Sequence, residues 1–81
     1  MARLRILSAR GDTVVEWDGQ GVEVGDPEAL AAVREAERIF GEQRARGATA
    51  FKVAPGRTAE RIDQFDPRAD QIIVVPRVAG G

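Results

Sequence analysis

Apolar and polar residues alternate, or apolar residues run together, in four short segments that predict β-strands. The segments are residues 2–8, 13–17, 48–53 and 71–75. β-Branched and aromatic residues, which favour strands, are common in them. The last segment is almost wholly apolar, which is typical of a central strand. The turn residues Arg10-Gly11-Asp12 separate the first two segments and predict a hairpin.

A 3.6-residue repeat of apolar positions predicts one long helix over residues 27–46. Asp26 stands at the N-cap position, and Pro27 suits the first helical position because it has no backbone N–H to satisfy. Gly47 is a natural residue just past the helix end, since it tolerates a left-handed conformation. The earlier run Asp18-Gly19-Gln20-Gly21 breaks the pattern and is predicted to be a loop.

Two interpretations remain for the stretch that follows Pro55-Gly56. Thr58 could cap a short helical or 3₁₀ turn, in which Ile62 and Phe65 stand three residues apart. A short edge strand is the alternative. Pro76 cannot donate to a strand ladder, so it is expected to end the sheet.

The order strand, strand, long helix, strand, short turn, strand predicts a two-layer α+β domain. The sheet would be mixed, with four to five strands, and the helix would lie across one of its faces. Parallel pairing of the first and last strands at the sheet centre buries the most apolar surface. We therefore expect one domain over residues 1–76 and a C-terminal tail over residues 77–81.

The residue inventory excludes most catalytic and metal chemistry. The 81 residues include no cysteine and no histidine, so there is no thiolate nucleophile, no imidazole base and no metal site of the usual ligand set. A domain of this size also has one small core and no room for a deep substrate pocket. We expect a protein that is not an enzyme, binds no metal and holds no cofactor of its own.

Charge and hydropathy narrow the range of partners. Twelve basic and thirteen acidic side chains are interleaved along the chain, which is unlike the basic footprint of a nucleic-acid-binding protein. No apolar run approaches the length of about 20 residues that spans a membrane. The N-terminus has no signal-peptide core. We expect a monomeric cytoplasmic protein that binds neither nucleic acid nor membrane.

The C-terminal segment carries a more specific signal. Phe65-Asp66-Pro67 is followed by the strand segment Asp70-Gln71-Ile72-Ile73-Val74-Val75-Pro76 and then by Arg77-Val78-Ala79-Gly80-Gly81. This ending is similar to that of prokaryotic sulfur carriers, such as the small subunit of molybdopterin synthase and the thiamine sulfur carrier. Its Pro-x-x-x-Gly-Gly pattern also resembles the tails of phage tail-assembly proteins with ubiquitin-like domains. Together with the element order, the ending resembles the β-grasp fold of ubiquitin and its relatives.

The resemblance implies a protein on which other proteins act. An activating enzyme would use ATP to adenylate the α-carboxylate of Gly81, and Gly80 would let the backbone pass through a narrow channel. The partner would contact the four residues before the diglycine, which are Pro76, Arg77, Val78 and Ala79. Sulfide would then give a thiocarboxylate for an acceptor enzyme, or an amine of a target protein would give a conjugate. Lys52, the single lysine, would be the only internal acceptor if copies were joined through side-chain lysines.

Several alternatives stay open at this point. A non-covalent ubiquitin-like module, associated for example with phage or other assemblies, would bind partners through its sheet face. Trp17 is either an exposed recognition aromatic or a residue at the edge of the core. Four acidic residues either bind a cation or a basic partner or form a solvated loop; they are Glu60, Asp63, Asp66 and Asp70.

Overall fold

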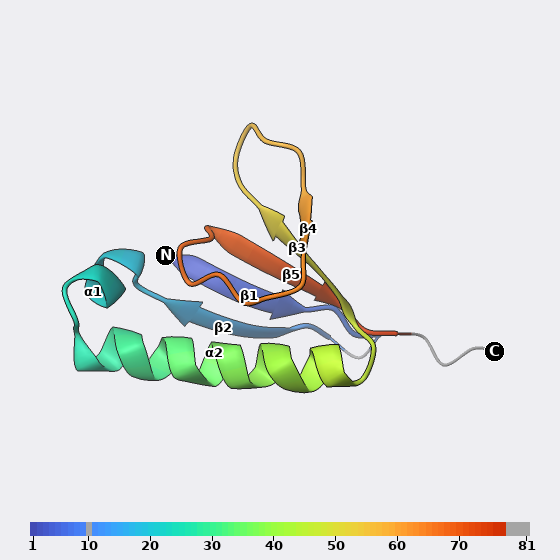
Figure 1. The fold of residues 1–81 in the computed structure, drawn as a ribbon, viewed down its shortest axis with the longest axis horizontal. Coiled ribbons are helices and arrows are strands. Elements are labelled where there is room, and N and C mark those ends of the chain that lie inside the picture. Colours follow the sequence, from blue (N-terminus) through green and yellow to red (C-terminus); the bar gives the residue numbers. More distant parts are fainter. Residues whose placement is uncertain (10, 78–81) are drawn as a thin grey trace.

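The computed structural model describes residues 1–9 and 11–77. In this part of the chain, two helices and five strands form a helix layer and a sheet layer (Figure 1). In chain order the elements are β1 (Ala2–Ile6), β2 (Thr13–Trp17), α1 (Gly19–Glu23), α2 (Pro27–Ala45), β3 (Thr49–Val53), β4 (Glu60–Ile62) and β5 (Gln71–Val75). The predicted α+β class, with a mixed sheet and one long helix, is confirmed.

The strands form one mixed sheet in the order β2-β1-β5-β3-β4. β1 and β5 run parallel, as predicted, with Leu4 opposite Ile72. β5 also pairs antiparallel with β3, with Ile73 opposite Phe51. β5 is therefore the central strand, held along both edges.

The long helix α2 covers one face of the sheet, and the core lies between the two layers (Figure 1). Alternate strand residues point toward the helix, so that Leu4, Ile72 and Val74 are fully buried. The helix contributes Ala36 and Phe40 to the same core. This small apolar cluster holds the central strand against the helix.

The segment after Asp18 differs from the predicted loop. It forms the short helix α1, in which the Asp18 carboxylate accepts a hydrogen bond from the Gln20 backbone N–H at 3.0 Å. Glycine disfavours helices, yet a Cβ at Gly21 would lie only 2.9 Å from the Ala29 Cβ of α2. The glycine allows α1 to pack closely on α2, and this tertiary contact offsets the low helix propensity.

The remaining differences concern element boundaries and one open choice. β1 ends at Ile6 rather than at residue 8, and α2 ends at Ala45 with Arg46 as its C-cap. The stretch after Thr58 contains an edge strand, β4, in which Arg61 pairs with Phe51 of β3. The helical-turn interpretation of this stretch was wrong, because pairing with β3 provides the backbone hydrogen bonds.

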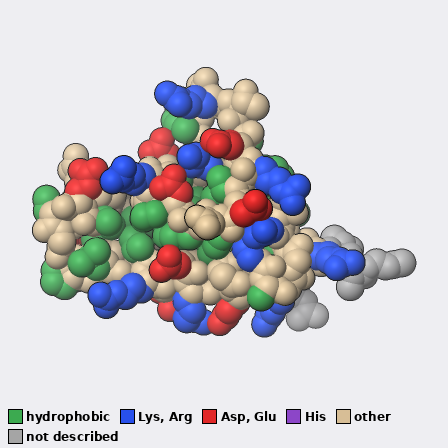
Figure 2. Space-filling view, viewed as in Figure 1, with side chains coloured by type: hydrophobic (Ala, Val, Ile, Leu, Met, Phe, Trp, Pro, Cys, Tyr) green, Lys and Arg blue, Asp and Glu red, His purple; other side chains and the backbone are tan. Residues whose placement is uncertain are grey.

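Charged side chains of both signs are interspersed around a group of hydrophobic ones on the face that Figure 2 shows. On the exposed surface of α2, Arg38 forms ion pairs with Glu35 and Glu42. The hydrogen bond from Arg38 lowers the pKa of Glu35 below its ordinary value, and it raises the pKa of Arg38 itself. Such exposed pairs contribute little to stability.

Candidate functional site

The predicted tail begins where β5 ends. Val75 is the last paired residue of the strand, and Pro76 and Arg77 follow it near the C-terminal end of α2 (Figure 1). We call residues 75–77 the tail root. The other predicted tail residues lie outside the described residues; they are Val78, Ala79, Gly80 and Gly81.

An open groove of about 810 Å³ lies beside the tail root. Its walls come from the β1–β2 hairpin, the last turn of α2 and the root itself. Leu7 and Val75 line it with apolar side chains that are 36% and 38% exposed, and Arg46 and Arg77 line it with cationic ones. Apolar surface next to two guanidinium groups complements a partner surface that combines apolar and acidic side chains.

Asp12 shapes the hairpin wall of this groove. Its carboxylate accepts a hydrogen bond from the Ser8 backbone N–H at 3.3 Å and lies 3.6 Å from Arg5 Nε. These contacts hold the β1–β2 turn together beside the groove. Arg10, from the predicted turn motif, lies outside the described residues.

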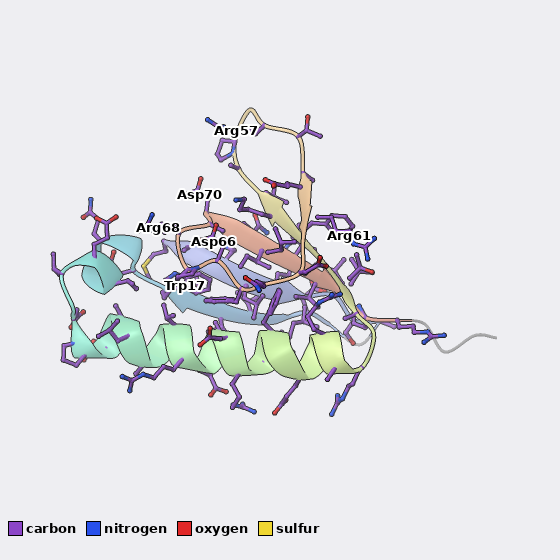
Figure 3. All side chains as sticks on the ribbon, in the orientation of Figure 1. Trp17, Arg57, Arg61, Asp66, Arg68 and Asp70 are labelled. Atoms are coloured by element: carbon purple, nitrogen blue, oxygen red, sulfur yellow. The ribbon has the colours of Figure 1, made fainter. Side chains whose placement is uncertain are left out.

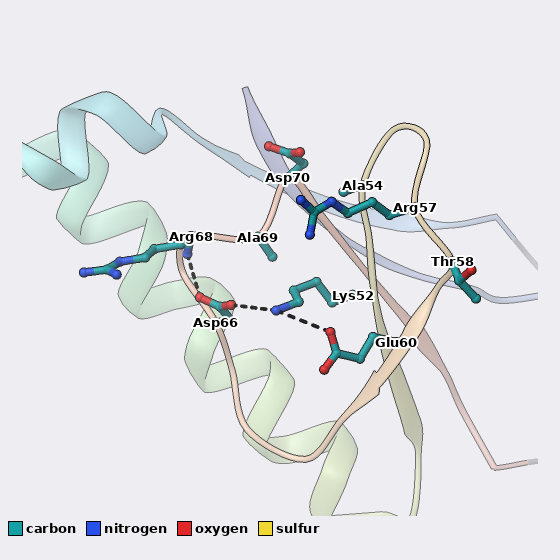
Figure 4. Close-up of a pocket in the computed structure, with 9 residues that line it drawn as sticks. All are labelled: Lys52, Ala54, Arg57, Thr58, Glu60, Asp66, Arg68, Ala69 and Asp70. Atoms are coloured by element: carbon teal, nitrogen blue, oxygen red, sulfur yellow. Dashed lines mark hydrogen bonds and ion pairs between the residues drawn. The ribbon is translucent and has the colours of Figure 1, made fainter.

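Lys52 lines a different cleft, of about 440 Å³, between the β3–β4 loop and the loop of residues 63–70 (Figure 4). Its Nζ lies 3.3 Å from Asp66 Oδ2 and 3.7 Å from Glu60 Oε2, and its side chain is about one-third exposed. Glu60 stands opposite Lys52 in the β3–β4 ladder, whereas Asp66 comes from the loop. The single lysine thus joins two segments and lines none of the groove at the tail root.

The four acidic residues singled out in the sequence do not converge on one point. Two of them contact Lys52, while Asp63 pairs with Arg44 at 3.1 Å and Asp70 lines the Lys52 cleft. Within residues 1–9 and 11–77, no three metal-ligating side chains are grouped closely enough to hold a metal ion. The acidic residues of this region mostly form ion pairs within the domain.

Arg57 and Arg68 also line the Lys52 cleft, although neither was a candidate site residue from the sequence (Figures 3 and 4). Arg57 comes from the loop between β3 and β4, and Arg68 from the loop before β5. Only the tertiary structure brings these two loops together. Neither arginine lies in a motif, so no local signal could have identified them.

Trp17 is a core residue and not an exposed recognition aromatic (Figure 3). Its side chain is almost fully buried, and its ring centroid lies 5.5 Å from that of Phe65. The indole N–H donates a hydrogen bond to the Pro67 carbonyl at 3.0 Å. Trp17 therefore ties the loop of residues 63–70 to the sheet.

The sheet face opposite α2 carries a row of cross-strand neighbours. From β2 to β4 the row is Val14, Arg5, Ile73, Phe51 and Arg61. Ile73 and Phe51 at its centre are half-buried, and an arginine stands on each side of them. This face therefore combines apolar and cationic side chains.

Among the described residues, no helix is long and apolar enough to cross a lipid bilayer. Comparison of the chain with protein-family models, curated proteins and solved structures gave no match.

Proposed function

We propose that this chain is a small ubiquitin-like carrier or modifier, and that a partner activating enzyme adenylates the α-carboxylate of Gly81. The observation that carries the proposal is the position of β5. This central strand is paired along both edges and ends at Val75, beside an open groove. A tail that starts there has a fixed root next to a surface that a partner can reach. Its five residues extend at most about 16–18 Å, enough to enter a partner's active site.

A carboxylate becomes a useful electrophile only after its oxygen is converted into a good leaving group. In the proposed reaction, one Gly81 carboxylate oxygen attacks the α-phosphorus of ATP, and pyrophosphate leaves. Hydrosulfide then attacks the acyl carbon and expels AMP, which leaves a thiocarboxylate after loss of a proton. An amine of a target protein attacks in the same way and gives an amide. Sulfur transfer and conjugation therefore require the same tail.

The partner supplies the catalytic groups and the nucleotide site. This chain contributes the reacting carboxylate, the narrow Gly80-Gly81 backbone and the surface at the tail root. Its lack of cysteine and histidine agrees with this division of roles. We propose that it acts as a monomer in the cytoplasm, with the adenylating enzyme and then an acceptor enzyme or target protein as partners.

The test combines the chain with a candidate adenylating enzyme from the same organism, ATP and labelled pyrophosphate. The intact chain should support exchange of label into ATP. With sulfide, its intact mass should rise by the difference between one sulfur atom and one oxygen atom. Deletion of Gly81, or addition of one residue after it, should abolish both results without changing thermal unfolding.

Gly41→Ala is the matched control for these tail variants. Gly41 lies in α2, and a Cβ there would meet no atom within 4 Å. This variant should keep full activity, so that loss of exchange is assigned to the tail and not to a generally altered domain. Exchange that survives deletion of Gly81 would show that the proposed function is wrong.

A non-covalent interaction module is the second candidate, and the row of residues on the open sheet face favours it. Its partner would present apolar side chains flanked by acidic ones. Arg61→Glu should then abolish partner binding, whereas deletion of Gly80 and Gly81 should leave it intact. A carrier would show its largest loss with the deletion.

A further inference from the structure

Gly47 and Arg77 stand opposite each other at the tail root. β3 and β5 are antiparallel, with Thr49 opposite Val75, and two more residues in the same register bring Gly47 opposite Arg77. A Cβ built on Gly47 would lie 3.2 Å from Arg77 Cδ and 3.8 Å from both its Cβ and its Nη1. The Arg77 side chain therefore lies against the space that a side chain at position 47 would fill.

The same glycine also ends the long helix. Gly47 has a φ of +89°, which L residues rarely adopt but glycine, which is achiral, adopts readily. Its N–H donates a hydrogen bond to the Arg44 carbonyl at 3.0 Å. The negative end of the α2 dipole lies here, where a guanidinium group is favourable. Gly47 thus terminates the helix and contacts the tail root at the same point.

We propose that Gly47 is a positioning residue for the tail. Because Gly47 has no Cβ, it leaves space for the Arg77 side chain, and we call this contact between Gly47 and Arg77 the seat. The seat fixes the point at which the chain leaves the sheet. The purpose of the seat rests on the proposed function, since a fixed root lowers the entropy lost when a partner binds the tail. Gly47 touches none of the reacting atoms and acts through Arg77.

Trypsin digestion tests the seat without any partner enzyme. Trypsin must take the Arg77 side chain into its specificity pocket, so Arg77 must leave Gly47 before the bond to Val78 is cut. Gly47→Ala should displace Arg77 and raise the initial rate of this cleavage about three- to tenfold. The rate of proteolysis follows the fraction of molecules in which Arg77 has left Gly47. Cleavage after the exposed Arg57, in the β3–β4 loop, is the internal reference.

Gly25→Ala is the matched control for backbone strain. Gly25 has a φ of +76°, but a Cβ there would meet no atom within 4 Å. This variant should leave the ratio of cleavage at Arg77 to cleavage at Arg57 unchanged. The proposal is overturned if Gly47→Ala leaves the ratio unchanged, or if Gly25→Ala raises it equally. Should alanine at position 47 prevent folding, Gly47→Asn replaces it, because Asn tolerates a left-handed backbone.

The exchange assay supplies the functional readout. Gly47→Ala should raise KM for this chain about three- to tenfold and leave kcat unchanged, because the reacting carboxylate is not altered. Gly25→Ala should change neither constant. If the intact chain supports no exchange, the proposed function fails, and the digestion still decides whether the seat exists. Normal KM for Gly47→Ala would overturn the positioning role even if digestion had changed.

Discussion

Two irregular segments of this domain, the loop of residues 63–70 and the tail root, are held in different ways. The loop is held by core aromatic side chains: Phe65 packs against the rings of Trp17 and Phe40, and the Trp17 indole donates a hydrogen bond to the Pro67 backbone carbonyl. Lys52 contacts the same loop at Asp66. The loop is therefore part of the structural framework.

The tail root is held by one strand pairing and by one contact with a glycine. Val75 pairs with Thr49 in the sheet, and Arg77 lies against Gly47. The root presents apolar and cationic side chains to the groove, as protein-binding surfaces do. We therefore expect opposite responses to mutation: changes at the loop should lower stability, and changes at the root should lower activity with a partner.

Trp17→Phe should give the largest loss of stability. The substitution keeps an aromatic ring, but it removes the donor to the Pro67 carbonyl and leaves unfilled space in the core. Together these effects should lower the free energy of unfolding by about 1–3 kcal/mol. Urea denaturation followed by circular dichroism measures the change.

Arg77→Ala is the counterpart of this variant at the tail root. The Arg77 side chain is exposed, so its removal should change the free energy of unfolding by less than about 0.5 kcal/mol. The same change should weaken exchange with the activating partner. If Arg77→Ala destabilised the domain as much as Trp17→Phe, the root would belong to the framework and the comparison would fail.

Most of the fold could be predicted because its signals are local. The apolar run of β5 identified the central strand. The start of α2 was predicted from Asp26 and Pro27, and its end from Gly47. α1 could not be predicted, because its glycines disfavour a helix, and the close approach of Gly21 to Ala29 appears only in the tertiary structure. β4 stayed ambiguous because three residues carry too little periodicity to separate a strand from a turn.

The candidate site was less predictable, because its contacts join segments that lie far apart in sequence. β5 ends at Val75, directly before Pro76, as the sequence predicted. The role of Pro76 and Arg77 in a partner-binding tail stays a prediction. Once β4 is known, the hairpin register brings Glu60 opposite Lys52. No local pattern brings Asp66 to the same lysine or Arg77 to Gly47. The first contact depends on the path of the loop of residues 63–70, and the second on the pairing of β3 with β5.

Lys52→Met should have a smaller effect than Trp17→Phe. The variant keeps most of the aliphatic stem and removes the ammonium group between Glu60 and Asp66. Because all three side chains are partly exposed, the free energy of unfolding should fall by about 1 kcal/mol or less. The loss should shrink at high salt, where surface electrostatics are screened. A loss that is equal at low and high salt would show that packing, not charge, holds the loop to the lysine.

The Arg38 ion pairs are an exposed reference for the Lys52 cleft, and their loss should have a smaller effect than the loss of the Lys52 pairs. Arg38, Glu35 and Glu42 have side chains that are 55%, 50% and 51% exposed, against 35% for both Lys52 and Asp66. Arg38→Met should therefore cost less stability than Lys52→Met in matched urea titrations. If Arg38→Met lowers the free energy of unfolding more than Lys52→Met does, side-chain exposure does not determine how much these ion pairs stabilise the domain. The ion pairs of Lys52 would then not distinguish the loop of residues 63–70 from the exposed surface of α2.

The pH dependence of the same pairs gives a second measurement. The hydrogen bond from Arg38 lowers the pKa of Glu35, so its stabilising contribution is fully present above the ordinary pKa of glutamate. The contribution is lost as the pH falls through the lowered pKa of the folded state. In a carboxyl NMR titration, Arg38→Met should move the Glu35 midpoint up to the ordinary value, whereas Lys52→Met should leave it in place. Arg38 is the group that lowers the pKa of Glu35. If the Glu35 midpoint is the same in Arg38→Met as in the unaltered chain, the ion pair is not formed in solution.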